Sequence, residues 1–331
     1  MIVEGVTGAR ATSAHPLPHR TRQALGSYMQ LPLGKIRQPA RRTNSASNPR
    51  EPTTREHDPG IHALFHVPAT MKLQRIGAPL GVLVEQVDVR TLTDAHWQDV
   101  QALFQQHQLL VLRGQQLTPE EHIAFGQRWG ELVRHPYAGM NSHPDIIELR
   151  NSGKARDINQ HWHSDMTYNA TPPKLTMLYA HSTPSIGGDT AFANQQLAYE
   201  ALSTGLRSVV DGLRAVHSAA GLAAHNGADS AKAPRAEHPV VRTHDETGRR
   251  ALYVCRAFTQ RLVDWTREES AALLEYLFAH SVRPEFQARH VWQPGDLALW
   301  DNRSLLHFAV HDHADEPRVI HRIQVAGLPP A

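Results

Sequence analysis

Two side chains with metal-binding chemistry stand two positions apart within the segment 160–168. His163 offers an imidazole and Asp165 offers a carboxylate. On an extended strand, residues at this spacing project from the same face, so both groups could reach one divalent cation. If a second imidazole arrives from far along the chain, the set becomes two histidines and one carboxylate. That set leaves open positions on Fe(II) for a co-substrate and dioxygen, so the segment predicts a candidate iron site.

The His-x-Asp spacing alone is not specific, because the chain contains 23 histidines. The same spacing occurs at His143/Asp145 and at His313/Asp315, and each pair could simply be a solvated polar pair. If a β-sandwich closes around the metal, the third ligand should lie on a late strand. The residue types leave four candidates open for it: His307, His311, His313 and His321.

The composition is that of a globular chain with a sizeable core. Its 331 residues are 40% apolar and carry a formal charge of +2. This balance does not call for a nucleic-acid partner or an anionic membrane. No apolar run has the length of a transmembrane helix, and the N-terminus lacks the apolar core of a secretion signal. The single Cys255 cannot form an internal disulfide, so we expect a cytoplasmic protein.

Residues 1–70 differ in composition from the remainder of the chain. They repeat Pro, Ser, Thr and Arg without a sustained period and contain nine Lys/Arg against four Asp/Glu. Such a segment buries little apolar surface, so we expect a disordered N-terminal extension. Three interpretations stay open: a non-native leader upstream of a start at Met71, a functional tail that could tether nucleic acid or membrane, and a transit peptide. We expect the globular domain to span residues 71–331.

From Met71 onward the sequence pattern becomes that of a globular domain with strands and helices. Alternation over residues 80–89 and the apolar run 109–112 predict strands. A helix should begin near residues 93–94. A second should run from the capping box Thr118–Glu121, with Pro at the first helical position, to about Gly130.

The second half of the chain continues this pattern. Residues 131–192 should be strand and loop, and residues 197–213 should form one or two helices. Residues 218–236, which are small and polar, should form a mobile loop or lid. The capping box at Thr266 predicts another helix, and residues 297–300 and 318–325 predict strands. Because βα alternation is lacking, we expect an antiparallel β core with flanking helices rather than a doubly wound sheet.

Several motifs, in this order, resemble the taurine dioxygenase (TauD/TfdA-type) family of Fe(II)/2-oxoglutarate-dependent dioxygenases. The resemblance covers residues 73–328 and rests on WHSD (162–165), GGDT (187–190), HPVVRTH (238–244), WDNR (300–303) with His307, and Arg318 with Arg322. It implies a double-stranded β-helix, or jelly roll, of the clavaminate synthase-like type. The fold would be mainly β with flanking helices.

The resemblance also assigns roles to individual residues. It makes His163, Asp165 and His307 the Fe(II) ligands and leaves the other two His-x-Asp pairs without a role. It makes Thr190 and Arg318 the partners of the distal carboxylate of 2-oxoglutarate, which suits a guanidinium fork beside a hydroxyl donor. Arg322 would lie near the iron-bound carboxylate and the substrate anion. No catalytic residue is implied beyond the metal ligands.

The implied reaction uses 2-oxoglutarate and dioxygen as co-substrates and yields succinate and carbon dioxide while the substrate is hydroxylated. In the taurine-type reaction, hydroxylation of the carbon that carries the sulfonate releases an aldehyde and sulfite. The substrate-contacting positions of the taurine enzyme correspond here to His135, Asn159, Phe258 and Arg322. The segment 218–236 departs from that enzyme because it is shorter and lacks its aromatic residues.

We therefore expect a small anionic substrate, foremost an alkyl sulfonate such as taurine. The alternatives are an alkyl sulfate ester and an aryloxyalkanoate, because the changed segment 218–236 removes one wall of the taurine pocket. A rival of another class is a non-catalytic, metal-binding jelly roll that senses a small molecule. The sequence leaves open a homo-oligomer, either a dimer or a tetramer.

Overall fold

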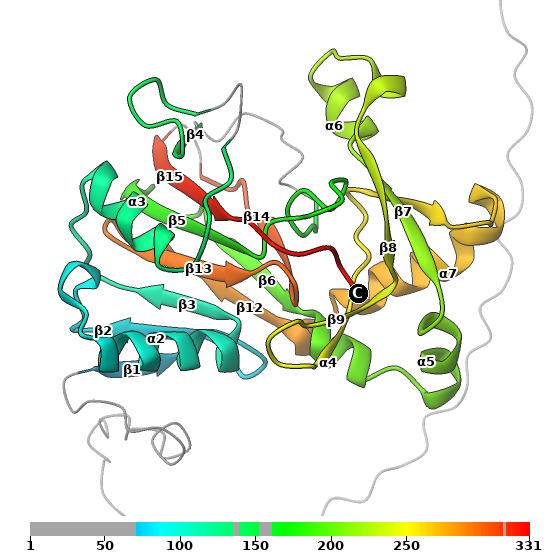
Figure 1. The fold of residues 1–331 in the computed structure, drawn as a ribbon, viewed down its shortest axis with the longest axis horizontal. Helices are drawn as coiled ribbons and strands as arrows, with labels where there is room; N and C mark the ends of the chain where they lie inside the picture. Colours follow the sequence, from blue (N-terminus) through cyan, green and yellow to red (C-terminus); the bar gives the residue numbers. More distant parts are fainter. Residues whose placement is uncertain (1–70, 135–138, 152–160, 314–315) are drawn as a thin grey trace, which may run out of the picture. The chain divides into compact units, whose positions relative to one another are not determined.

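The computed structural model describes residues 71–134, 139–151, 161–313 and 316–331 (Figure 1). The extension 1–70 therefore lies outside the described residues, as do His135, Asn159 and Asp315. The described residues belong to one compact unit, which comprises residues 57–331. Within the described ranges, no helix is both long enough and apolar enough to cross a membrane.

The larger sheet of the described unit has seven strands in the order β1-β2-β3-β13-β5-β15-β4. All neighbouring strands pair antiparallel except β2 and β3, which pair parallel. The strands β3 and β13 in the middle of this sheet are buried over their whole length, because both faces of the sheet are covered. The strand bounds are β1 (Lys72–Arg75), β2 (Val82–Glu85), β3 (Leu109–Leu112), β4 (Ile147–Asn151), β5 (Leu175–Ser182), β13 (Leu297–Asp301) and β15 (Arg318–Val325).

A smaller antiparallel sheet, in the order β12-β6-β14, packs against the larger one. Its strands are β6 (Thr190–Asn194), β12 (Gln287–His290) and β14 (Leu305–Ala309). Phe192 of β6 contacts Trp300 of β13, with ring centroids 5.5 Å apart, in an apolar cluster that also contains Leu178, Leu305 and Ile320. This two-sheet sandwich confirms the expected jelly roll.

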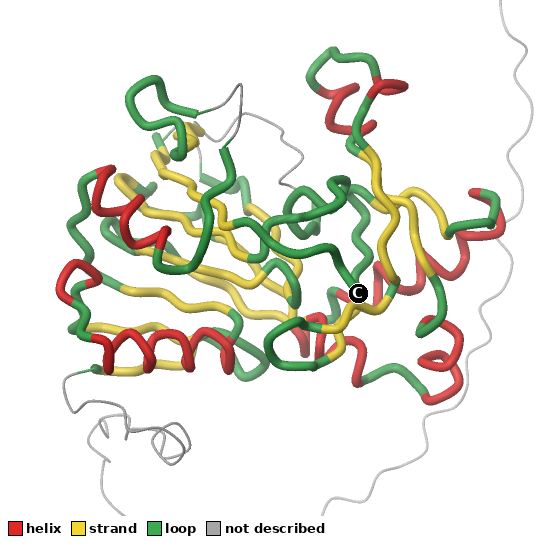
Figure 2. The backbone as a smooth tube through the Cα atoms, in the orientation of Figure 1, coloured by secondary structure: helices red, strands yellow, loops and turns green. Residues whose placement is uncertain are grey.

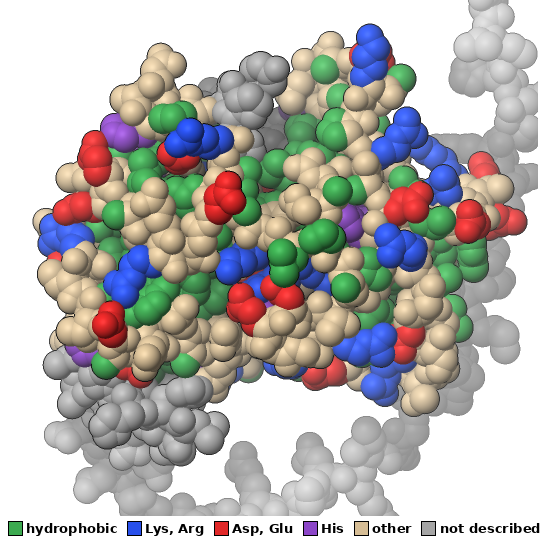
Figure 3. Space-filling view, viewed as in Figure 1, with side chains coloured by type: hydrophobic (Ala, Val, Ile, Leu, Met, Phe, Trp, Pro, Cys, Tyr) green, Lys and Arg blue, Asp and Glu red, His purple; other side chains and the backbone are tan. Residues whose placement is uncertain are grey.

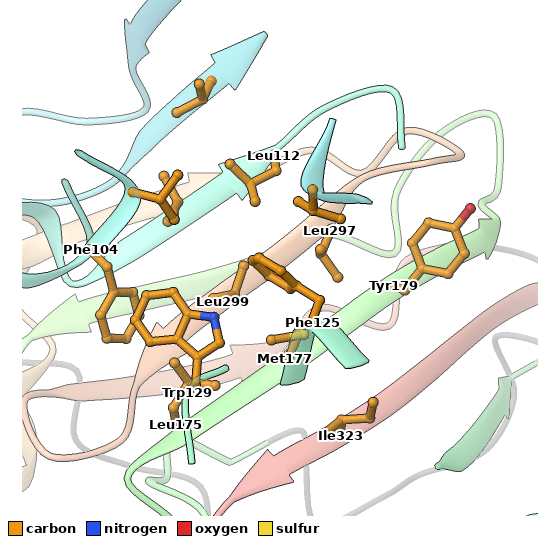
Figure 4. Packing of buried hydrophobic residues seen from close by; sticks show 14 of the residues in the cluster. Phe104, Leu112, Phe125, Trp129, Leu175, Met177, Tyr179, Leu297, Leu299 and Ile323 are labelled. Atoms are coloured by element: carbon orange, nitrogen blue, oxygen red, sulfur yellow. The ribbon is translucent and has the colours of Figure 1, made fainter. Parts of the chain in front are cut away.

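The other face of the larger sheet is covered by helices α2 (Asp94–His107) and α3 (Pro119–Gln127). Figure 4 shows Phe104, Phe125 and Trp129 packed over side chains of the sheet. Trp129 contacts both Phe104 and Phe125 edge-on. The two faces of the larger sheet therefore pack against different elements, because helices cover one face and the smaller sheet covers the other.

A third group of elements extends the sandwich on the side of β6 and β14. It contains a sheet in the order β11-β7-β8, a two-stranded sheet of β9 and β10, and four helices. Figure 2 shows these strands among helices. The bounds are α4 (Gln195–Glu200), α5 (Thr204–Val210), β7 (Arg214–Ser218), α6 (Ala220–His225), β8 (Arg235–Pro239), β9 (Val241–Thr243), β10 (Arg250–Leu252), β11 (Thr259–Leu262) and α7 (Arg267–Ser281).

Local signals in the sequence located most elements well. The capping boxes at Thr118 and Thr266 both form and begin α3 and α7. The strand expected over 80–89 is shorter, because only Val82–Glu85 finds pairing partners. The segment 218–236 was wrongly expected to be a loop throughout. It contains α6 and a short 3-10 helix (Ser230–Lys232), since its alanines favour helix.

Charges of both signs are interspersed on the face of the molecule drawn in Figure 3. Among the described residues, many charged side chains form ion pairs at the surface, such as Lys72 with Glu85 at 2.7 Å and Arg256 with Glu275 at 2.5 Å. Such exposed pairs contribute little stability each.

A buried histidine in α3 makes the stability of the fold sensitive to acid. His122 is 1% exposed and packs on Tyr179, with 5.8 Å between ring centroids. Burial, assisted by the charges on His321 and His181, lowers the pKa of His122 to about 3. His122 therefore binds a proton near pH 6.5 in the unfolded chain but only near pH 3 in the folded protein. Because the unfolded chain binds more protons between these values, the free energy of unfolding decreases as the pH falls through this range.

We expect the His122→Leu variant to lose this part of the acid sensitivity. Below pH 6.5, one such proton lowers the free energy of unfolding by at most about 1.4 kcal/mol per pH unit. Urea unfolding of wild type and variant at pH 7.5 and 5.5 measures the difference. Parallel stability curves for the two proteins would contradict the role of His122.

Candidate metal centre and co-substrate pocket

His163, Asp165 and His307 meet between the two sheets of the sandwich. His307 lies on β14, and its backbone forms an isolated bridge with His163, with N–O distances of 2.7 and 3.1 Å. Asp165 Oδ1 lies 3.5 Å from Nε2 of His163 and 3.5 Å from Nε2 of His307. All three side chains are buried, and their candidate ligand atoms lie within 4.8 Å of one another. The structure thus gathers two imidazoles and one carboxylate around one point.

The backbone around Asp165 differs from the extended strand that the sequence suggested. His163 is a single bridge residue, and Asp165 already stands in a turn. The next residue, Met166, has a φ of 49°, a left-handed conformation that an unbranched side chain can adopt at some cost. His238 of β8 stabilises the turn, because its Nε2 lies 2.8 Å from the carbonyl oxygen of Thr167 and 3.0 Å from that of Asn169. The HPVVRTH motif therefore supports the turn that carries Asp165.

The donor set fits a divalent cation. His163 Nδ1 lies 2.7 Å from the His161 carbonyl oxygen and must donate to it, so Nε2 is the ring nitrogen that can bind a metal. Burial, together with the neighbouring His163, lowers the pKa of His307 to about 4, so that ring is neutral near pH 7. Burial works to raise the pKa of Asp165, yet the two imidazoles hold it well below its ordinary range. Two imidazole nitrogens and one carboxylate oxygen are ligands that Fe(II) accepts.

The remaining His-x-Asp pairs and the other candidate histidines lie elsewhere. His143 Nε2 pairs with Glu120 at 2.7 Å, and Asp145 pairs with Arg134 at 2.8 Å. His321 faces the opposite side of the larger sheet, where its Nδ1 lies 2.8 Å from His181 Nε2. His311 lines a pocket that also contains Asp165 and His307. His313 is buried, and its ring centroid lies 6.0 Å from that of His311. Of the four candidates, His307 is the one placed within reach of both His163 and Asp165.

A pocket adjoins the His163–Asp165–His307 cluster between the sheets. It is lined by two residues of the cluster, Asp165 and His307, and by apolar, hydroxyl and basic residues, namely Leu149, Leu178, Thr190, Trp300, Ala309, His311, Arg318 and Arg322. Arg318 and Arg322 both project into it from β15, as their four-residue spacing predicted. The pocket therefore combines a cluster of metal-binding type with two guanidiniums.

Arg318 is buried without a full counter-charge. Its side chain is 6% exposed, and its Nε has no hydrogen-bond partner among the described residues. Burial lowers the pKa of Arg318 to about 10 although Asp189 acts to raise it. Asp189 is itself bound at 2.5 Å by Nε of Arg289. A buried guanidinium in this situation favours an incoming anion.

The turn at Gly187 and Gly188 brings the chain close to Arg318. Both glycines have positive φ values, 80° and 69°, which glycine adopts without strain. A Cβ on Gly188 would lie 2.9 Å from Pro184 and 3.4 Å from Cδ of Arg318. The glycines therefore allow β6 to begin at Thr190 directly beside the guanidinium.

Trp292, which the sequence analysis missed, contacts two residues that line the pocket, Thr190 and Arg318. Its indole N–H donates to Thr190 Oγ1 at 3.0 Å, and the guanidinium carbon of Arg318 lies 5.5 Å from the centroid of its ring. A hydroxyl that accepts this bond keeps its own proton for another acceptor. Trp292 thus leaves Thr190 ready to donate into the pocket. A buried tryptophan looks like core in a sequence, so no signal marked it.

The substrate-side residues are only partly described. Phe258 stands edge-on to His163, with 6.0 Å between ring centroids, and Tyr168 packs edge-on against Phe258 at 5.1 Å. Tyr168 had not been singled out from the sequence. Burial raises the pKa of Tyr168, with a further contribution from the negative charge of Asp165. His135 and Asn159 lie outside the described residues.

A jelly roll that holds two histidines and a carboxylate between its sheets is typical of the non-haem dioxygenases. The chain belongs to the family described as taurine catabolism dioxygenase TauD, TfdA family, whose model matches residues 69–324. This family assignment confirms the resemblance stated from the motifs.

Proteins similar to this chain include characterised dioxygenases. An (S)-phenoxypropionate/alpha-ketoglutarate-dioxygenase of Sphingobium herbicidovorans is 34% identical over 277 residues, which cover 77% of this chain and 94% of that protein. An alkylsulfatase of Acinetobacter baylyi is 35% identical over 76% of this chain and 83% of its own. A crystal structure of a taurine dioxygenase from Burkholderia xenovorans superposes with a TM-score of 0.70 at 35% identity, covering 79% and 91% of the two chains. This chain is therefore an alpha-ketoglutarate-dependent dioxygenase, an oxidoreductase.

Proposed function

We propose that this dioxygenase uses Fe(II), 2-oxoglutarate and dioxygen to hydroxylate a small anionic organic compound, foremost an alkyl sulfonate. The observation that carries the proposal is the pocket that joins the His163–Asp165–His307 cluster to Arg318 and Arg322. A cation and two guanidiniums in one cavity suit two organic anions, the co-substrate and the substrate.

His163, Asp165 and His307 would hold the iron, which when bound supplies the redox chemistry that activates dioxygen. Arg318 and the hydroxyl of Thr190 would bind the distal carboxylate of 2-oxoglutarate. The indole N–H of Trp292 donates to that hydroxyl and thereby leaves its proton for the carboxylate. The apolar side chains of Leu149, Leu178 and Trp300 line the same cavity and exclude water from it.

Arg322 also lines the pocket and would bind the anionic group of the substrate. It would lie close to the 2-oxoglutarate site as well. The aromatic rings of Phe258 and Tyr168 lie on the His163 side of the cluster and would contact the substrate chain. Among the described residues, the pocket lining contains no carboxylate other than Asp165 to pair with the ammonium group of taurine, whereas these rings suit an apolar chain. Within the alkyl sulfonates we therefore expect longer apolar chains to be preferred.

The relatives leave two further substrate classes open for this pocket. Their names include a sulfate ester dioxygenase of Pseudomonas putida and a 2,4-dichlorophenoxyacetate dioxygenase of Cupriavidus pinatubonensis, 33% identical each. An alkyl sulfate ester and an aryloxyalkanoate share the anion and differ in the group that carries it. Both are accordingly alternatives to the sulfonate.

A substrate panel tests the proposal. Succinate formation is measured with Fe(II), 2-oxoglutarate and one of four compounds: taurine, hexanesulfonate, hexyl sulfate or phenoxyacetate. We expect hexanesulfonate to stimulate succinate formation most. A stronger response to hexyl sulfate or phenoxyacetate would transfer the assignment to that class, and no response to any anion would contradict the proposal.

Trp292→Phe should weaken 2-oxoglutarate binding while it leaves iron binding unchanged. The variant keeps the apolar ring and removes the N–H donor to Thr190. One net hydrogen bond is worth about 1 kcal/mol, so we expect the dissociation constant of 2-oxoglutarate to rise about fivefold. Anaerobic titration of the Fe(II) protein, followed by the charge-transfer band, measures it. A Thr190→Val variant should show at least the same loss, and an unchanged constant in Trp292→Phe would exclude the orienting role.

A further inference from the structure

The second carboxylate oxygen of Asp165 points away from the two histidines and is fully engaged. Its Oδ2 accepts a hydrogen bond from Thr176 Oγ1 at 2.6 Å and another from Gln324 Nε2 at 2.9 Å. Thr176 of β5 is 0% exposed and Gln324 of β15 is 2% exposed. Both donors are supplied by neighbouring strands of the larger sheet, which pair at Thr176 and Gln324.

The direction of the bond from Thr176 is determined by its other contacts. Thr176 Oγ1 lies 2.8 Å from Asn302 Nδ2 and 3.2 Å from Gln324 Nε2, and both of these amide nitrogens can only donate. A hydroxyl group has two lone pairs and one proton. With both lone pairs occupied, the single proton of Thr176 must point at Asp165.

The orientation of the Asn302 amide is also determined. Its Oδ1 accepts the indole N–H of Trp300 at 3.1 Å, so its nitrogen must face Thr176. Ser164, the residue before Asp165, donates to the Asn302 carbonyl oxygen at 2.6 Å. A chain of donors thus runs from Trp300 through Asn302 and Thr176 to the carboxylate, and each member is buried.

We propose that Thr176 and Gln324 are positioning residues that restrict Asp165 to metal binding through one oxygen. With Oδ2 saturated by two donors, only Oδ1 faces the histidines. A carboxylate with both oxygens free can bind a metal through both. The position that the second oxygen would occupy then stays available for the co-substrates. This inference rests on the metal ligands of the proposed function.

Mn(II) provides a probe of this arrangement that does not depend on turnover, and a related structure, AAD-2, was solved with Mn(II) and N-oxalylglycine. The number of waters on bound Mn(II) is read from the enhancement of water-proton relaxation. Three protein atoms on an octahedral ion leave three water positions, and a second carboxylate oxygen would remove one of them. In Thr176→Val combined with Gln324→Met, we expect the enhancement per bound ion to fall by about one third.

Thr176→Ser is the matched control, because it keeps the hydroxyl that donates to Asp165 and should keep the wild-type relaxation value. A purely structural role of Thr176 and Gln324 would lower the melting temperature of the metal-free protein and leave the relaxation per bound ion unchanged, and that result overturns the inference. If the double variant does not fold, Thr176→Val alone is judged by the same criterion. Wild-type protein that binds no Mn(II) would instead refute the metal ligands themselves, which separates the two failures.

Discussion

His307→Ala is expected to reduce substrate-dependent succinate formation by more than about a hundredfold. Loss of a residue that merely hydrogen-bonds to a metal ligand typically costs 10–100-fold in metal affinity or activity, so loss of a ligand should cost more. The cluster has two nitrogen ligands, Nε2 of His163 and Nε2 of His307, which both lie 3.5 Å from Asp165 Oδ1. It contains no third imidazole among the described residues that could replace the one removed. The measurement pairs succinate formation with the Fe(II) dissociation constant, and His163→Ala should behave alike.

His143→Ala is the matched control for this prediction. His143 belongs to a His-x-Asp pair of the same spacing, but it pairs with Glu120 near the surface. Its removal should leave turnover and Fe(II) affinity within about twofold of wild type, as is usual for substitutions away from special features. Full activity in His307→Ala, or equal losses in both variants, would refute the proposal that His163, Asp165 and His307 bind the metal.

The comparison of these two pairs shows what the sequence could and could not decide. His143 with Asp145 and His163 with Asp165 have the same spacing and residue types. The difference between them is long-range, because it depends on β14 delivering His307 to one pair through a bridge at His163. Spacing along the chain does not contain that information, so it came from the family resemblance and from the structure.

Features with a local cause were predicted most reliably. The capping boxes at Thr118 and Thr266 begin helices because their hydrogen bonds join residues three positions apart. The shared face of Arg318 and Arg322 follows from strand geometry in the same way. Gln324 continues that face and could have been predicted with them. Lid-like composition was misleading at 220–225, where alanines form α6.

Residues that act through another residue left little trace in the sequence. Thr176 has apolar neighbours along β5, and Trp292 belongs to an apolar cluster, so both look like core positions in the sequence. Their roles arise from hydrogen bonds to partners that are distant in sequence, Asp165 and Thr190 respectively. A sequence records the residue types, whereas the assignment of donors requires the distances between them.

Arg318→Met is expected to separate co-substrate binding from stability, because it should weaken 2-oxoglutarate binding without lowering the stability of the protein. The substitution removes a guanidinium that is buried without a full counter-charge and replaces it with an apolar chain of related length. Replacing a buried charge by an apolar group is often neutral or stabilising. The melting temperature of the protein without 2-oxoglutarate should therefore stay level or rise.

The affinity of the same variant for 2-oxoglutarate should fall by about 3 kcal/mol, which is roughly a hundredfold, because the distal carboxylate would lose its charged partner in a buried site. Anaerobic titration of the Fe(II) protein gives this constant, and thermal unfolding without 2-oxoglutarate gives the stability. Arg318→Lys keeps the charge but not the planar fork and should lie between wild type and Arg318→Met. A variant that loses stability yet binds 2-oxoglutarate as wild type does would show that Arg318 supports the fold and not the co-substrate.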